Sequence, residues 1–188
     1  MIEAALALIL VALSHAARAR HGLNMADEGY LWHGTLRIGQ GLIPIRDYKS
    51  YDPARFYWCW GWMKLFGTGI LGLRRATAVF QALGLWAGLS VLGQVTGSVV
   101  SLALAGLVLA IWMQPRHKGF EHGQSLITAF SAVTLLAAPS PGTALLAGVL
   151  TGLAGFMGRN HGAYALAATG CALIYLALKT DLPGLVLP

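Results

Sequence analysis

Long apolar stretches alternate with short polar breaks along this chain of 188 residues. No charged residue occurs from 76 to 115 or from 123 to 158. A helix needs about 20 mostly apolar residues to cross a bilayer, so each stretch is long enough for a hairpin of two short spans. Strands cannot cross a membrane unless they close a barrel, and the pattern therefore predicts an all-α protein.

The breaks divide the chain into about six predicted membrane spans within one transmembrane domain. The predicted parts are a first span at 1–17, a long loop with interfacial helices at 18–71 and five further spans at 72–178. The first apolar run is also compatible with a cleaved signal peptide, but no basic region precedes it, which favours a retained helix.

Four breaks separate the later spans. Those at 97–98 and 139–141 are short and uncharged, and the prolines of the second cannot continue a helix. Those at 114–122 and 158–162 hold most of the remaining polar chemistry. Because successive spans end on opposite sides of a membrane, the long first loop and these two polar breaks are expected to share one face.

Composition supports the membrane interpretation. The chain is 56% hydrophobic and 11% charged, whereas soluble domains carry about 25% charged residues. Nine of its 13 basic residues lie between Arg18 and Arg75, among many tyrosines and tryptophans. Aromatic rings collect at membrane interfaces and cations meet lipid phosphates there. We therefore expect a multi-pass membrane protein that contacts lipid and no nucleic acid; its oligomeric state stays open.

Small residues recur at the spacing that lets membrane helices approach closely. The pairs are Gly84 with Gly88 and Gly148 with Gly152. Packing within one subunit is the preferred interpretation of both pairs.

An acidic pair, Asp27 and Glu28, stands near the start of the long loop. Asn24 with Asp27 three residues later resembles a helix N-cap box, and a helix N-terminus favours carboxylates. This structural interpretation accounts for one acid. It does not account for an acidic pair beside a membrane face rich in cations, where an acid can serve as a general base.

A second polar segment lies between Pro44 and Pro53, which fix an extended loop. Arg46, Lys49 and Arg55 lie within ten residues of one another, and arginine can bind phosphate oxygens in a bidentate fork. The alternative is a solvated loop with local ion pairs such as that between Arg46 and Asp47.

These motifs together resemble the first external loop of GT-C transferases, the protein O-mannosyltransferase and aminoarabinose-transferase-like enzymes. The matching segments, in order, are Asp27-Glu28-Gly29-Tyr30, residues 41–48, Tyr51-Asp52-Pro53, Phe56-Tyr57, Leu65-Phe66-Gly67, Leu73-Arg74 and residues 158–164. The family commonly has Pro-Pro where this chain has Pro53-Ala54. Its members are several hundred residues long, so we expect this chain to represent their N-terminal part without the C-terminal half.

The resemblance implies a multi-pass helical fold in the bacterial inner membrane, a polyprenyl-phosphate-linked sugar donor and activation of the acceptor by Asp27. In the hypothesis built on it, Asp27 takes the acceptor proton and Glu28 positions it. The hypothesis is displacement at the anomeric carbon, a cell-envelope glycosyltransferase reaction. Candidate substrate-binding residues are Arg46, Asp47, Lys49, Asp52, Arg55, Arg74, Arg116, His117, Lys118, Glu121, Arg159 and His161.

Three questions stay open at this stage. No cofactor is expected, and although His117, Glu121 and His122 could ligate a divalent metal, their spacing fits no named motif. The excess of Lys and Arg would place the long loop in the cytoplasm, whereas the resemblance places it outside, and the rule is weaker for long loops. The rival function is a non-enzymatic scaffold or small transporter subunit that binds lipid phosphate.

Overall fold

A computed structural model describes residues 1–114 and 119–179, and within them the protein is all-helical, without a β-strand. This confirms the predicted all-α class, while the six membrane spans stay a prediction. The elements in chain order are α1 (Ile2–Arg18), the single π-helical turn η1 (Met25–Gly29), α2 (Tyr30–Gly39), α3 (Pro53–Phe66), α4 (Ile70–Gly93), α5 (Val99–Trp112), α6 (Glu121–Ala137), α7 (Pro141–Met157) and α8 (Arg159–Lys179).

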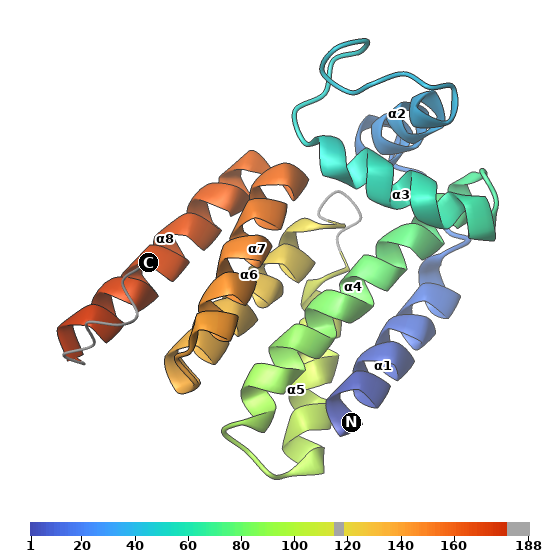
Figure 1. Ribbon diagram of the computed structural model, residues 1–188. Helices are drawn as coiled ribbons and strands as arrows, with labels where there is room; N and C mark the ends of the chain where they lie inside the picture. The colour runs from blue at the N-terminus through green and yellow to red at the C-terminus, as the bar shows by residue number, and fades with distance from the viewer. Residues whose placement is uncertain (115–118, 180–188) are drawn as a thin grey trace.

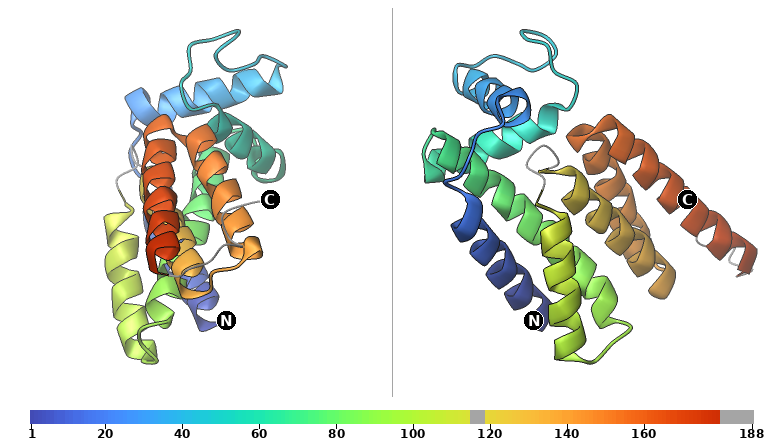
Figure 2. Two further views of the ribbon diagram at one scale, coloured as in Figure 1. Left: turned by 60° about the vertical axis from the view of Figure 1, so that its left-hand side comes forward. Right: turned by 180° about the vertical axis from the view of Figure 1, so that it is seen from behind.

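Six helices form a bundle, and two lie across one end of it (Figure 1). Helices α1 and α4 to α8 run along the bundle, while α2 and α3 cover the end at which α4 begins. The turned views in Figure 2 show the same arrangement, with the α4–α5 and α6–α7 turns at the opposite end. The long segment 18–71 thus forms the layer of short helices that its composition predicts.

Side-chain caps explain the two uncharged turns. Ser98 accepts a hydrogen bond from the amide of Ser101 and begins α5. Ser140 and Thr143 form a capping box, with Pro141 in the first turn of α7, where a proline costs no hydrogen bond. Both predicted turns are confirmed.

The predicted break at 158–162 is wrong in its extent. Only Gly158 separates α7 from α8, and the next four residues form the first turn of α8. Gly162 serves close packing instead of a loop, because a Cβ on it would lie 2.4 Å from the Cα of Gly155. The two glycines therefore allow α7 and α8 to cross at short range.

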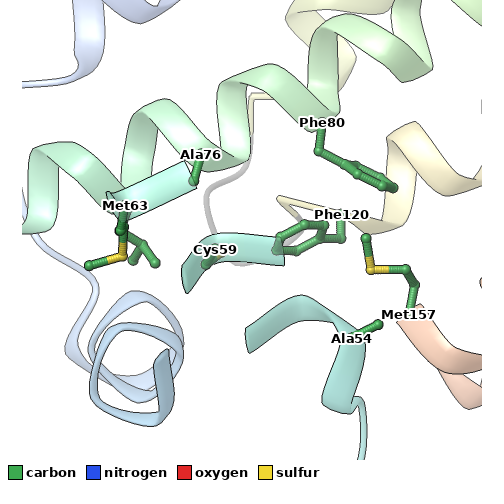
Figure 3. Close-up of a cluster of buried hydrophobic side chains, with 8 residues drawn as sticks. Ala54, Cys59, Met63, Ala76, Phe80, Phe120 and Met157 are labelled. Atoms are coloured by element: carbon green, nitrogen blue, oxygen red, sulfur yellow. The ribbon is translucent and has the colours of Figure 1, made fainter. Parts of the chain in front are cut away.

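A buried cluster fastens the α2–α3 layer to the bundle. Figure 3 shows Cys59 and Met63 of α3 near Ala76 of α4, with Phe80, Phe120 and Met157 continuing the cluster toward the other helices. The indole of Trp58 also donates a hydrogen bond of 2.8 Å to the carbonyl of Ala76. Burial of these side chains holds α3 rigidly over the end of α4.

The glycine pairs behave differently from each other. A Cβ on Gly84 would lie 2.3 Å from the Cα of Gly123, and one on Gly88 would lie 3.0 Å from Leu126. Gly84 and Gly88 thus pack α4 on α6, as predicted. A Cβ on Gly148 or Gly152 would meet nothing within 4 Å. The prediction that Gly148 and Gly152 pack against another helix is therefore wrong within the described part of the chain.

Among the described residues, two helices, α4 and α8, are long and apolar enough to cross a membrane by length and composition. Helices α5 and α7 are apolar but shorter, with 14 and 17 residues. At about 1.5 Å per residue α5 extends roughly 21 Å, less than the hydrocarbon core of about 30 Å. Only 17% of the most apolar window of α8 is buried within the protein, so most of its apolar surface faces outward.

Candidate functional site

A cavity of about 660 Å³ lies where the α2–α3 layer meets the bundle. Its walls come from the end of α1, from η1, from the segment that enters α3, and from the first turns of α4, α6 and α8. The long first loop and the described residues of both polar breaks therefore share one face, as predicted. Of the predicted site residues, those that line it are Asp27, Glu28, Asp52, Arg55, Arg74, Glu121, Arg159 and His161.

Asp27 sits in a turn that Asn24 organises. The side-chain oxygen of Asn24 accepts hydrogen bonds from the amides of Ala26 and Asp27, and its Nδ2 donates one of 2.8 Å to the Asp27 carboxylate. The predicted cap is thus confirmed. The turn is π-helical, a rare geometry that is frequent at functional sites. It leaves Asp27 exposed, with its side chain at the wall of the cavity.

Glu28 is buried beside Asp27 and forms a two-pronged ion pair with Arg74 of α4. Its carboxylate oxygens lie 2.8 and 2.9 Å from the Arg74 nitrogens, and the two side chains are 7% and 9% exposed. Arg74 also donates to the carbonyls of Ala19 and Gly22, and the amide of Asn24 donates to Glu28. The pair therefore holds the segment between α1 and η1 on α4, and it fixes the turn that carries Asp27.

Arg55 connects α3 to two other parts of the bundle. It lies 2.8 Å from a Glu121 oxygen and 3.2 Å from an Asp52 oxygen, and its Nε donates to the carbonyl of Met157. Its guanidinium also lies over the ring of Phe120. Because two carboxylates already neutralise Arg55, its surroundings are less suited to an additional anion than its charge alone suggests.

Arg159 and His161 lie in the first turn of α8. They line the same cavity as η1, although they are far from it in sequence. The amide of Arg159 donates to Asp52 at 3.3 Å, and its exposed guanidinium lies 5.6 Å from the ring centroid of Tyr51. A helix N-terminus carries a partial positive charge. The cation and the helix end both contribute positive charge to this wall, and the Asp52 carboxylate offsets part of it.

Three candidates lie away from the cavity and three outside the described residues. Arg46 and Asp47 form the local ion pair that the structural alternative predicts, and Lys49 lies exposed beside them. Two hydrogen bonds to the carboxylate lower the pKa of Asp47 to about 2. The one from Arg46 has the larger effect, and the one from the amide of Ile43 has the smaller. Arg116, His117 and Lys118 are not among the described residues. Roles of all six in substrate binding stay predictions.

Several lining residues were not among the predicted site residues. They include Ser14, His15, Arg18, Tyr30, Thr77, Gln81, Gln114, His122 and Tyr164. A signal for some of them exists in the sequence. Arg74, Thr77 and Gln81 follow one another at helical spacing along α4, which places three polar side chains on one face of an apolar helix.

Metal chemistry finds no support among the described residues, where no group of three or more His, Cys, Asp or Glu side chains could hold an ion. Comparison with known proteins yields no matching family model, no matching curated protein and no matching solved structure. The function must therefore be argued from the cavity itself.

Proposed function

We propose that this chain is the membrane-embedded part of a GT-C-type glycosyltransferase, which moves a sugar from a polyprenyl-phosphate-linked donor to an acceptor at one membrane face. The observation that carries the proposal is the cavity at the end of the bundle. It places the exposed acid Asp27 and the cation Arg159, 132 residues apart in sequence, around one space large enough for a small ligand.

The outer surface of the bundle supports a membrane location. Large apolar side chains are exposed along α5, α7 and α8, including Leu104, Leu145, Leu166, Ile174 and Leu178. Soluble monomers rarely expose contiguous apolar patches of more than a few hundred square ångströms. A lipid environment for these helices, with six spans and the α2–α3 layer at the interface, accounts for this surface and for the shortness of α5, which local thinning of the bilayer accommodates.

Each wall of the cavity has a distinct role in this mechanism. Asp27 accepts the proton of the acceptor hydroxyl as the acceptor oxygen bonds to the anomeric carbon. The bond from that carbon to the donor phosphate breaks, and the phosphate leaves with the electron pair. Arg159 and His161 stabilise the charge on the leaving phosphate, an electrostatic effect that is usually a large part of catalysis. Arg55 and Arg74, already paired with carboxylates, keep the walls in place.

A second candidate is a scaffold that binds lipid phosphate without catalysis. The ion pairs of the site favour it, because Glu28, Asp52 and Glu121 all hold arginines and Asp27 bonds to its own cap. This candidate needs the electropositive wall but no base. Asp27 therefore separates the two functions.

The test replaces Asp27 by asparagine in the full-length protein and measures sugar transfer in membranes from a labelled polyprenyl-phosphate sugar. Asparagine keeps the size of the side chain but cannot accept the proton, and loss of a general base costs about 10²–10⁴-fold in rate. Glu3→Gln, an acid-to-amide change outside the cavity, is the control and should retain activity. Full activity of Asp27→Asn would remove Asp27 from the mechanism and favour the scaffold.

A further inference from the structure

Three tyrosines give the cavity an exposed aromatic surface. Tyr30, Tyr51 and Tyr164 line the cavity and remain 40%, 55% and 64% exposed. Two phenylalanines of the same wall, Phe56 and Phe120, are only 2% exposed and serve the core. The tyrosines therefore leave ring surface open to the cavity, although Tyr30 also packs edge-on against Phe56 and donates a hydrogen bond to the carbonyl of Lys49.

The ring of Tyr51 is held in place by its neighbours. Asp52, the next residue, accepts a hydrogen bond from the amide of Arg159 and pairs with Arg55. This connection fastens the entry to α3 onto the first turn of α8, and it brings the guanidinium of Arg159 over the Tyr51 ring. One turn further along α8, Tyr164 packs edge-on against His161 with ring centroids 6.0 Å apart. Tyr51 and Tyr164 are thus both connected to the first turn of α8, Tyr51 through Arg159 and Tyr164 through His161.

A pyranose ring has the complementary chemistry. Its C–H groups carry small positive partial charges and match the negative face of an aromatic ring, while its hydroxyl groups donate to carboxylates at the edge. Tyrosine offers a large rigid contact surface at a small cost in conformational entropy. In a phosphate-linked sugar the anion lies next to the sugar ring, and Arg159 lies over one face of the Tyr51 ring, so a sugar at Tyr51 would contact the other face or the ring edge with its phosphate near Arg159.

We propose that Tyr51 and Tyr164 form the platform on which the sugar of the donor lies, with Arg159 beside it for the phosphate. This inference rests on the proposed function and deepens it, because it separates the part of the cavity that recognises the sugar from the part that recognises lipid phosphate. The alternative is that the tyrosines only anchor the protein at the membrane interface. Tyr175 of α8 provides a matched control, since it is 51% exposed and lies outside the cavity.

The experiment compares bare undecaprenyl phosphate with the same lipid carrying one of four sugars. The full-length protein in nanodiscs is titrated with undecaprenyl phosphate and with the same lipid carrying mannose, glucose, galactose or 4-amino-4-deoxyarabinose. We expect at least one glycosylated lipid to bind more tightly than the bare lipid. Tyr51→Ala and Tyr164→Ala should each reduce that preference by about fivefold to tenfold, with little change in the affinity for bare lipid. Tyr51→Phe and Tyr175→Ala should preserve the preference.

The other outcomes are distinguishable. A preference unchanged in both alanine variants, or an equal loss of affinity for bare and glycosylated lipid, would overturn the platform. Wild-type protein that binds bare and glycosylated lipid equally would overturn the platform and leave lipid-phosphate binding intact. Wild-type protein that binds neither lipid would overturn the proposed function and the platform together. Binding of bare lipid also reports that each variant is folded.

Discussion

Neighbouring charges of the site differ in what surrounds them, and this decides their roles. Asp27 and Glu28 are adjacent in sequence, yet one is exposed at the cavity and the other is buried against Arg74. The same contrast separates Arg74, which holds three backbone or side-chain partners, from Arg75, which is exposed and reaches only the carbonyl of Phe66 at 3.5 Å. The proposed base, Asp27, therefore depends for its position on the buried ion pair formed by its neighbour Glu28.

Arg74→Ala should destabilise the protein far more than Arg75→Ala. Removal of one partner from a buried ion pair leaves the other charge buried and costs about 3–5 kcal/mol. Exposed positions usually change stability by about 0.5 kcal/mol or less. Thermal unfolding of both variants in the same detergent measures the difference. Equal unfolding temperatures for the two variants would show that the Glu28–Arg74 pair does not hold the turn around Asp27.

Sequence-local contacts of the site could be predicted, and distant ones could not. The cap of Asn24 and the pair of Arg46 with Asp47 follow from residues within three positions of each other. The pair of Arg55 with Glu121 joins residues 66 positions apart and depends on how α3 crosses α6. The burial of Glu28 beside the exposed Asp27 could not be predicted either, because only the fold shows which of two adjacent carboxylates is buried.

Helix packing in this protein depends on where glycines face. The apolar runs predicted the bundle helices to within a few residues, because a run without charges has one stable structure in an apolar environment. They did not predict the start of α8, since a glycine in a polar stretch indicates a loop as readily as a close helix crossing. They also could not show that Gly84 faces another helix whereas Gly148 does not.

Gly84→Ala and Gly148→Ala should therefore have opposite effects on stability. A methyl group on Gly84 would overlap Gly123 of α6 and force the two helices apart, at a cost of about 1–3 kcal/mol. On Gly148 it would meet nothing within the described protein, and alanine should stabilise the helix by about 0.5–1 kcal/mol. Thermal unfolding compares the two. A destabilised Gly148→Ala would show that another helix packs against this face of α7.

The whole molecule places its cavity at one end of the bundle and its two uncharged turns at the other (Figure 1). This polarity follows from the alternation of polar and uncharged breaks, so it could be predicted before the fold was known. The resemblance to GT-C enzymes places the cavity end outside, and the distribution of Lys and Arg argues for the reverse.

Cysteine labelling in intact bacterial cells tests the orientation. In a Cys171→Ala background, Gln40→Cys reports on the cavity end and Gly97→Cys on the α4–α5 turn at the opposite end. We expect an impermeant thiol reagent to label the first variant in intact cells and the second only after lysis. Native Cys59 is fully buried and should stay unlabelled in the folded protein. The reverse labelling pattern would place the cavity in the cytoplasm and contradict the proposed donor side.

The most direct test of the central claim is photo-crosslinking with undecaprenyl phosphate that carries a photoreactive group next to the phosphate. If the cavity binds the lipid phosphate, crosslinked peptides identified by mass spectrometry should contain the first turn of α8 around Arg159 or the first turn of α6 around Glu121. Unlabelled undecaprenyl phosphate should compete with this crosslinking, and Arg159→Ala should reduce it. Crosslinks confined to the exposed loop at 43–49, or spread evenly over the apolar helices without competition, would contradict the account.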